Sequence, residues 1–409
     1  MDYTYVSDFK KLGYGLFVHF GLYSSFGGGE WYYNEHSKTW KTDPWDPIKL
    51  DHYLKEGKAR FHPKANWAKD LCRMAKKAGM RYVCLTTRHH EGFSLFDNHG
   101  LNDFDAPHVL GRDLVQEFVD ACHEYNLVPF FYCSVIDWWE PSYLNHDFPK
   151  YFSYLKDSIR ILCTNYGPIG GIWFDGTWGL PKGISFPTEI YALIHELQPK
   201  AIVTNNTGLG ALGEQGSDLL DCVTFERGKS FPVVNPNRPL AGEVCDSLTD
   251  HWGYAKDDIH FKSVSYVLKE LVEARANGCN LLLNVGPHAD GSVSPIEKEI
   301  LYAVGRWLKK NKYAVLNAEA SPLKAENALV MEDGKHRYFL LEDVPMASDA
   351  NVARFQETKK VRLEDGARFH SPVYLDNGEK VVLTDRSSFI PKPFYYGSSW
   401  IVRVVKDRK

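Results

Sequence analysis

The residue pattern that first suggests chemistry is an apolar run that ends in a carboxylate, GGIWFDGTWG at positions 170–179. Asp175 closes the run IWF and is followed at once by Gly176. A buried ionisable group is unfavourable unless it is paired or used, so Asp175 is either a well-satisfied structural residue or a functional one. Two other carboxylates occupy comparable places, because Glu226 ends the run CVTFE and Glu243 lies in the run LAGEV.

Further polar side chains also stand at or near the ends of apolar runs: His19, His89, His90 and Tyr132. Three histidines with several carboxylates could ligate a metal. Adjacent His89 and His90 would point to opposite faces of a strand, although a loop would let them converge, and neither HExxH nor HxH occurs. We expect no metal and no cofactor. Two carboxylates at the rim of a metal-free pocket indicate glycoside hydrolysis, in which one is the nucleophile or base and the other the acid.

The elements that must position these residues alternate along the chain between strand and helix patterns. Eight runs predict strands, at 15–20, 82–87, 129–134, 172–176, 201–206, 222–226, 240–244 and 280–286. Six amphipathic patterns predict helices, at 66–80, 112–126, 151–166, 188–199, 262–278 and 294–311. Apolar strands that alternate with helices are typical of a parallel sheet covered by helices. Eight of them favour a (β/α)8 TIM-like barrel over a doubly wound sheet, since no GxGxxG follows any strand.

In such a barrel the active site is built at the carboxyl ends of the strands, which is where Asp175 lies. After about residue 318 the pattern changes to short alternating runs with Asp-Gly and Asn-Gly turns, which predict hairpins. We therefore expect an α/β chain with a catalytic barrel over residues 1–317 and a β-sandwich domain over 318–409.

The composition excludes several classes of function. A net charge of −4 and a pI near 6.5 provide no basic field, so nucleic acid is not an expected partner. No stretch approaches the length of a membrane span, and the N-terminal residues lack the apolar segment of a secretory signal, so we expect a cytoplasmic protein without membrane association. The eight cysteines form no CxxC pair and are predicted to be reduced core residues. The sequence allows a homo-oligomer. The 11 Trp, 23 Tyr and 23 Phe fit either a large core or a pocket that stacks on sugars.

Several motifs in order along the barrel resemble those of family 29 α-L-fucosidases. GLFVHFGLYSSFGGGEWY is similar to the family's first-strand motif, with Phe20 where that family usually has Trp. TTRHHEGFSLFDN resembles its His-His-Asp-Gly-Phe motif with Glu91 replacing Asp, and GGIWFDG resembles its nucleophile strand. FYCSVIDWWEP, GEVCDSLTDHWGY and NLLLNVGPHADGSVSP resemble further signatures, so the likeness spans roughly residues 11 to 311.

The resemblance implies a retaining α-L-fucosidase that acts on a fucosylated oligosaccharide or glycoside. Asp175 would be the nucleophile, and Gly176 would let the sugar approach it. The residues implied to bind the fucose are His19, Glu30, Trp31, His89, His90 and Tyr132, with Trp178 as a further wall. Glu226 is preferred as acid/base over Glu243, whose surroundings match the family's Trp-Glu-x-Cys signature with Gly242 replacing Trp. Arg227 would either orient a carboxylate or be a surface charge.

Two other functions fit the same residues. The chain could bind fucose without catalysis, which an intact Asp175 argues against, or it could be a retaining glycosidase for a related, galactose-like sugar. Hydrolysis of a chromogenic aryl α-L-fucoside distinguishes a catalyst from a lectin.

Overall fold

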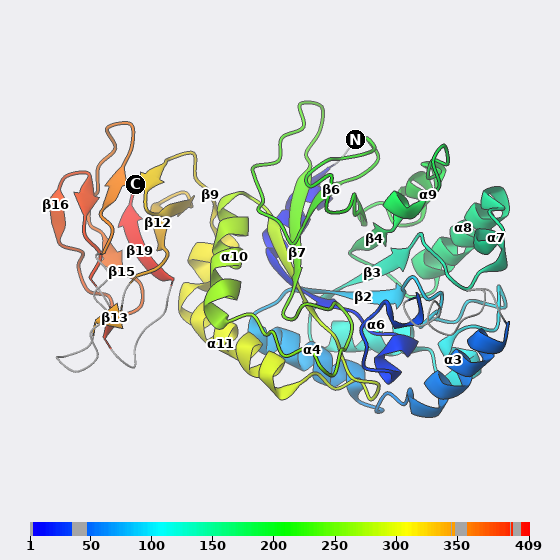
Figure 1. Ribbon diagram of the computed structural model, residues 1–409. Coiled ribbons are helices and arrows are strands. Elements are labelled where there is room, and N and C mark those ends of the chain that lie inside the picture. Colours follow the sequence, from blue (N-terminus) through cyan, green and yellow to red (C-terminus); the bar gives the residue numbers. More distant parts are fainter. Residues whose placement is uncertain (1–2, 35–46, 345, 348–357, 393, 396–401) are drawn as a thin grey trace.

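A closed barrel of eight parallel strands forms the larger part of the computed structural model, which describes residues 3–34, 47–344, 346–347, 358–392, 394–395 and 402–409 (Figure 1). The strands are β1 (Tyr14–Val18), β2 (Tyr82–Arg88), β3 (Val128–Ser134), β4 (Gly171–Asp175), β5 (Ile202–Asn205), β6 (Cys222–Glu226), β7 (Ala241–Ser247) and β8 (Asn280–Val285). Each strand pairs with its sequence neighbours, and β8 closes on β1. The predicted barrel is confirmed, with every predicted strand in place.

The strands are buried on both faces, and their side chains alternate between two cores. On β1, Leu16 and Val18 face the surrounding helices, whereas Phe17 belongs to the cluster inside the barrel. Helix α1 (Thr4–Leu12) adds Val6 and Phe9 to that inner cluster, next to residues from the amino ends of the strands. The barrel is therefore filled by side chains, and α1 covers its amino-terminal end.

Helices surround the barrel except beside two of its connections. The longer ones are α3 (Pro47–Arg60), α4 (Trp67–Ala78), α6 (Leu114–Glu124), α8 (Phe148–Thr164), α9 (Glu189–Leu197), α10 (Val264–Ala276) and α11 (Pro295–Lys312), and the short ones are η1 (Leu22–Ser25), α5 (Ala106–Leu110), α7 (Pro141–Leu144) and η2 (Thr177–Gly179). The six predicted helices are present, whereas α1 and α3 were not predicted. The described connections at 206–221 and 227–240 contain no helix.

The residues after α11 and the π-helical turn η3 (Tyr313–Asn317) form antiparallel sheets, as predicted for a sandwich. Their strands are β9 (Glu319–Ala320), β10 (Ala325–Glu326), β11 (Leu329–Glu332), β12 (His336–Leu341), β14 (Val361–Leu363), β15 (Val373–Tyr374), β16 (Leu383–Asp385), β17 (Ser388–Phe389) and β19 (Arg403–Arg408), with a separate parallel pair β13 (Met346–Ala347) and β18 (Phe394–Tyr395). One sheet has the order β10-β14-β17-β16 and the other β15-β19-β12-β11-β9.

Strand β12 shows how the small domain is attached to the barrel. Phe339 and Leu341 pack into the core between its sheets, while Tyr338 and Leu340 face the other way and join the main core of the barrel. Figure 1 shows α10 and α11 between the barrel and this domain. Trp307 of α11 donates its indole N–H to the carbonyl of Val402, at 2.9 Å. The sheet is thus buried on both faces and stabilises the outer side of the barrel.

The eight cysteines are all buried and free. Among the described helices, none has the length and apolar character needed to cross a membrane.

Candidate active site

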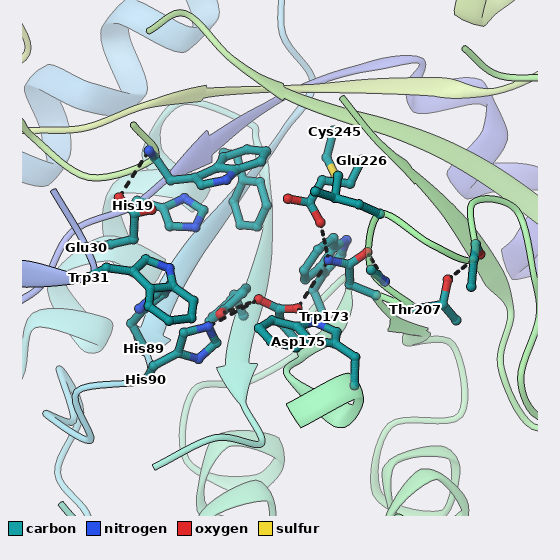
Figure 2. Close-up of a pocket in the computed structure, with 18 of the residues that line it drawn as sticks. His19, Glu30, Trp31, His89, His90, Trp173, Asp175, Thr207, Glu226 and Cys245 are labelled. Atoms are coloured by element: carbon teal, nitrogen blue, oxygen red, sulfur yellow. Dashed lines mark hydrogen bonds and ion pairs between the residues drawn. The ribbon is translucent and has the colours of Figure 1, made fainter. Parts of the chain in front are cut away.

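A pocket of about 530 Å³ opens at the carboxyl ends of the barrel strands (Figure 2). It is lined by aromatic rings, carboxylates, histidines and one loop segment: Phe17, His19, Glu30, Trp31, His89, His90, Tyr132, Trp173, Asp175, Trp178, Asn206, Thr207, Gly208, Leu209, Gly210, Ala211, Glu226, Cys245 and Trp252. Nine of the eleven site residues predicted from the sequence are in this list; Glu243 and Arg227 are not.

Asp175 is the last residue of β4, and its side chain is 14 % exposed, with both oxygens in defined contacts. Oδ1 accepts hydrogen bonds from the Asn206 amide at 3.2 Å, the Trp178 indole N–H at 3.1 Å and the backbone N–H of Gly176 at 2.8 Å. Oδ2 accepts one from the Tyr132 hydroxyl at 2.9 Å and lies 3.7 Å from His90 Nε2. Three donors on Oδ1 leave Oδ2 as the oxygen better able to attack an electrophile.

Gly176 has a different role from the one predicted. Its φ of 91° is in the left-handed region, and a Cβ placed on it would lie 2.8 Å from Ile136 Cγ1. Gly176 is also not a lining residue of the pocket. The glycine is therefore needed for the turn that follows β4 and for packing against Ile136, rather than for access of a ligand to Asp175.

Glu226 ends β6 and faces Asp175 across one amide. Its Oε2 accepts a 2.7 Å hydrogen bond from Asn206 Nδ2, the same nitrogen that contacts Asp175, and Figure 2 shows both bonds meeting on one side chain. Burial raises the pKa of Glu226 above its ordinary value, and the negative charge of Asp175 adds to the rise, while the bond from Asn206 opposes it. A raised pKa keeps a carboxyl protonated closer to neutral pH, as a general acid requires.

Glu243 lies inside the barrel and away from the pocket. It is fully buried, and its carboxylate accepts hydrogen bonds from the Tyr82 hydroxyl at 2.5 Å and from the Trp173 indole at 3.0 Å. Burial raises its pKa to about 7. Trp173 lines the pocket, so its hydrogen bond connects Glu243 to the wall of the site.

Hydrogen bonds fix the tautomers of two of the three histidines. The amide of Asn284 donates to Ser247 and to the Trp252 carbonyl, so its Oδ1 must accept from His19 Nδ1, 2.7 Å away. Ser134 donates to the Ile136 carbonyl and therefore accepts from His90 Nδ1 at 2.5 Å. In both rings Nε2 is left as an acceptor for a hydroxyl group.

Burial keeps the histidines neutral. It lowers the pKa of His19 to about 3 and that of His90 to about 4, although Asp175 acts in the opposite direction on His90. The pKa of His89 is lowered well below its usual value by burial and by the two neighbouring imidazoles. His89 stacks on the Tyr132 ring with centroids 5.4 Å apart. Neutral imidazoles beside a carboxylate suit a polyhydroxylated, uncharged ligand better than an anion.

Glu30 and Trp31 enter the pocket from the loop that follows η1. Glu30 Oε2 accepts hydrogen bonds from the backbone N–H groups of Trp252 and Gly253, at 3.1 and 2.8 Å, and so fixes the segment after β7. Arg227 lies outside the pocket, with its guanidinium 4.9 Å from the centroid of the Trp252 ring and bonded to the carbonyl of Asp250. Arg227 thus contacts a wall residue and no carboxylate of the site.

Several lining residues were not predicted from the sequence. Phe17 and Trp173 lie in predicted strands, and Cys245 directly follows the predicted strand 240–244. In such strands the alternation of side chains identifies an inward face but not a pocket. Asn206 ends the predicted strand 201–206, much as Asp175 ends the apolar run IWF. Its position at a strand end was therefore a signal that it could line the site. Trp252 lies in the motif GEVCDSLTDHWGY, which was an available signal. The segment from Thr207 to Ala211 depends on loop conformation, which the sequence pattern does not predict.

No group of metal-ligand geometry occurs among the described lining residues. In the described chain, Asp250, Asp258 and His260 come close enough together to share an ion, but they are outside the pocket.

Comparisons with known proteins identify the family of the chain. The family model described as Alpha-L-fucosidase matches residues 3–313. The tissue alpha-L-fucosidase of Bos taurus is 31 % identical over 80 % of this chain and 72 % of its own length, and that of Homo sapiens is 30 % identical over 75 % and 68 %. The structure of alpha-L-fucosidase isoenzyme 1 from Paenibacillus thiaminolyticus superimposes with a TM-score of 0.82 at 26 % identity, covering 99 % of this chain and 98 % of that one. The chain belongs to the alpha-L-fucosidase family.

Proposed function

We propose that this protein is a retaining α-L-fucosidase that removes terminal α-linked L-fucose from glycans or glycosides. The observation that carries the proposal is the pair Asp175 and Glu226, which face each other in a pocket of neutral histidines and aromatic rings. Asp175 Oδ1 and Glu226 Oε2 lie 3.2 and 2.7 Å from the same Asn206 nitrogen, so these two oxygens are at most about 5.9 Å apart. Retaining glycosidases separate their carboxyls by roughly 5–5.5 Å and inverting ones by roughly 6.5–9.5 Å, so the bound favours retention.

The reaction has two steps in this geometry. Asp175 attacks the anomeric carbon of the fucose while Glu226 donates its proton to the glycosidic oxygen, and the aglycone leaves. The product of this step is a fucosyl ester of Asp175. Glu226, now ionised, takes a proton from water, whose oxygen attacks the same carbon and releases fucose with its original configuration.

The remaining lining residues would bind the sugar. His19 and His90 offer Nε2 as acceptors for sugar hydroxyls, and the Tyr132 hydroxyl holds the nucleophile in place. The rings of Phe17 and Trp252 are apolar surfaces suited to the C–H face and methyl group of a deoxy sugar. The predicted cytoplasmic location and homo-oligomer stay predictions.

The test is hydrolysis of an aryl α-L-fucoside followed by proton NMR from the first turnover. We expect α-L-fucose to appear before its mutarotation product. Initial release of β-L-fucose would contradict retention. Binding of fucose without release of the phenol would identify a lectin, and faster hydrolysis of the matching α-L-galactoside would identify the galactose-like specificity.

A further inference from the structure

Asn206 is a buried amide that contacts both carboxyls of the site. Its side chain is almost fully buried, and it directly follows β5, whereas Asp175 and Glu226 end the two neighbouring strands β4 and β6. Nδ2 lies 3.2 Å from Asp175 Oδ1 and 2.7 Å from Glu226 Oε2. An amide nitrogen carries two hydrogens, so one is directed to each carboxyl.

The orientation of this amide is fixed from its other side. Asn206 Oδ1 accepts a hydrogen bond from the Thr224 hydroxyl at 3.0 Å and from the backbone N–H of Gly208 at 3.3 Å. The Gly208 N–H can only donate and the Asp175 carboxylate can only accept, so a flipped amide would set NH₂ against an N–H group and a carbonyl oxygen against a carboxylate. Nδ2 must therefore face Asp175 and Glu226.

A fixed donor restricts where the proton of Glu226 can reside. The amide nitrogen has no lone pair that accepts a hydrogen bond, so a proton on Oε2 would meet an N–H group. The proton is consequently placed on Oε1, and Oε2 acts as the carbonyl oxygen that accepts from Asn206.

We propose that Asn206 is a positioning residue, which holds the nucleophile and the acid/base at one separation and confines the transferable proton of Glu226 to Oε1. This inference rests on the function proposed above. Without Asn206, Glu226 could turn about its side-chain bonds and hold the proton on either oxygen, which would reduce the fraction of molecules ready to protonate a leaving group.

The inference predicts a shift in the pH profile. The basic limb of kcat/KM reports loss of the Glu226 proton in the free enzyme. Three charged neighbours influence the pKa of Glu226: Asp175 of β4 and Glu30 of the first loop raise it, and Arg227 lowers it. The thiol of Cys245 on β7 also lies in this pocket, where Glu226 raises the pKa of the thiol. Asn206 favours the ionised form, so its removal lets Glu226 keep its proton to higher pH.

The experiment compares Asn206→Ala, Asn206→Asp and Thr224→Val with a matched control, Asn205→Ala. Asn205 is the preceding residue of the same type, but its amide donates to the Thr177 hydroxyl at 3.0 Å and contacts neither carboxyl. Each variant is assayed with aryl α-L-fucosides of good and poor leaving groups across pH, and its thermal unfolding is recorded.

For Asn206→Ala we expect the midpoint of the basic limb to rise by about one pH unit. Loss of a hydrogen bond to a charged group changes the pKa of that group by about one unit. We also expect about a tenfold greater loss of kcat/KM for poor leaving groups than for good ones. Asn206→Asp, which adds a third anion, should move the limb further. Thr224→Val, which frees one side of the amide, should move it less but in the same direction, and it provides the test if the Asn206 variants do not fold.

The alternative role is structural. A lowered unfolding temperature with an unmoved basic limb, as expected for Asn205→Ala, would overturn the role of Asn206 while leaving the fucosidase function intact. Absence of turnover by the unaltered protein would overturn both the proposed function and this assignment.

Discussion

Replacement of Glu226 by alanine should separate the two chemical steps. General acid–base catalysis contributes about 10²- to 10⁴-fold, or roughly 3–5 kcal/mol of the barrier. We therefore expect fucosides of weakly acidic alcohols to lose about that factor in kcat/KM. Fucosides of strongly acidic phenols need no proton to leave, so their first step should be nearly unaffected and the fucosyl ester of Asp175 should accumulate.

The structure also predicts how the second step can be rescued. Removal of the Glu226 carboxylate leaves Asn206 Nδ2 without the acceptor that it had at 2.7 Å. Azide is an anion that fits the vacated volume, can accept from this amide, and needs no general base to attack. It should restore turnover of the activated substrates and give α-L-fucosyl azide, with the configuration of the substrate retained.

The assay is a series of aryl α-L-fucosides with and without azide, with the product identified by NMR. Glu243→Ala is the paired control, because Glu243 contacts Tyr82 and Trp173 inside the barrel. An effect of Glu226→Ala that is equal for good and poor leaving groups, together with leaving-group dependence and azide rescue in Glu243→Ala, would refute the assignment of the acid/base.

Three further predictions test other parts of the structure. Asp175→Ala should abolish turnover while the fold survives, and azide should then give the inverted β-L-fucosyl azide, so near-normal activity would contradict a nucleophilic role. Glu243→Gln should raise stability above pH 7. The folded pKa of about 7 exceeds the unfolded value of 4.5, so the free energy of unfolding of the wild-type protein falls by up to about 3 kcal/mol as pH rises between these two values. Chemical denaturation at pH 5 and pH 9 would measure this fall. Leu209→Asp should raise KM about tenfold for aryl fucosides relative to fucosyl fluoride, because the exposed Leu209 side chain lines the pocket where an aglycone would lie; equal effects on both would exclude this contact.

The barrel could be predicted from the sequence because its strands carry their signal locally. Runs such as IWF before Asp175 and LLL in β8 are apolar on both faces, as parallel strands require. Helix α1 was missed because its nine residues are few, and they are held by Phe9 and Val6 packing inside a barrel that forms from distant segments. That packing cannot be read from a single short window.

The site could be predicted in its main components but not in its connections. Asp175 and Glu226 stood out as carboxylates at strand ends. Asn206 is 31 residues from the first and 20 from the second along the chain, and only closure of the barrel brings the three together. For Arg227 the sequence left two roles open, orienting a carboxylate or being a surface charge. In the structure its φ of 48° turns the chain directly after Glu226, and its guanidinium lies over Trp252.

The packed interior of the barrel has a consequence for the order of events in turnover. Phe17, Tyr132 and Trp173 form the floor of the pocket, and below them α1 closes the amino-terminal end. In the described part of the barrel these side chains leave no exit through the interior, so the aglycone departs on the carboxyl-terminal side, from which water also arrives. Departure of the first product is therefore a precondition for hydrolysis of the ester, and an alcohol that lingers in the mouth competes with water for the fucosyl group.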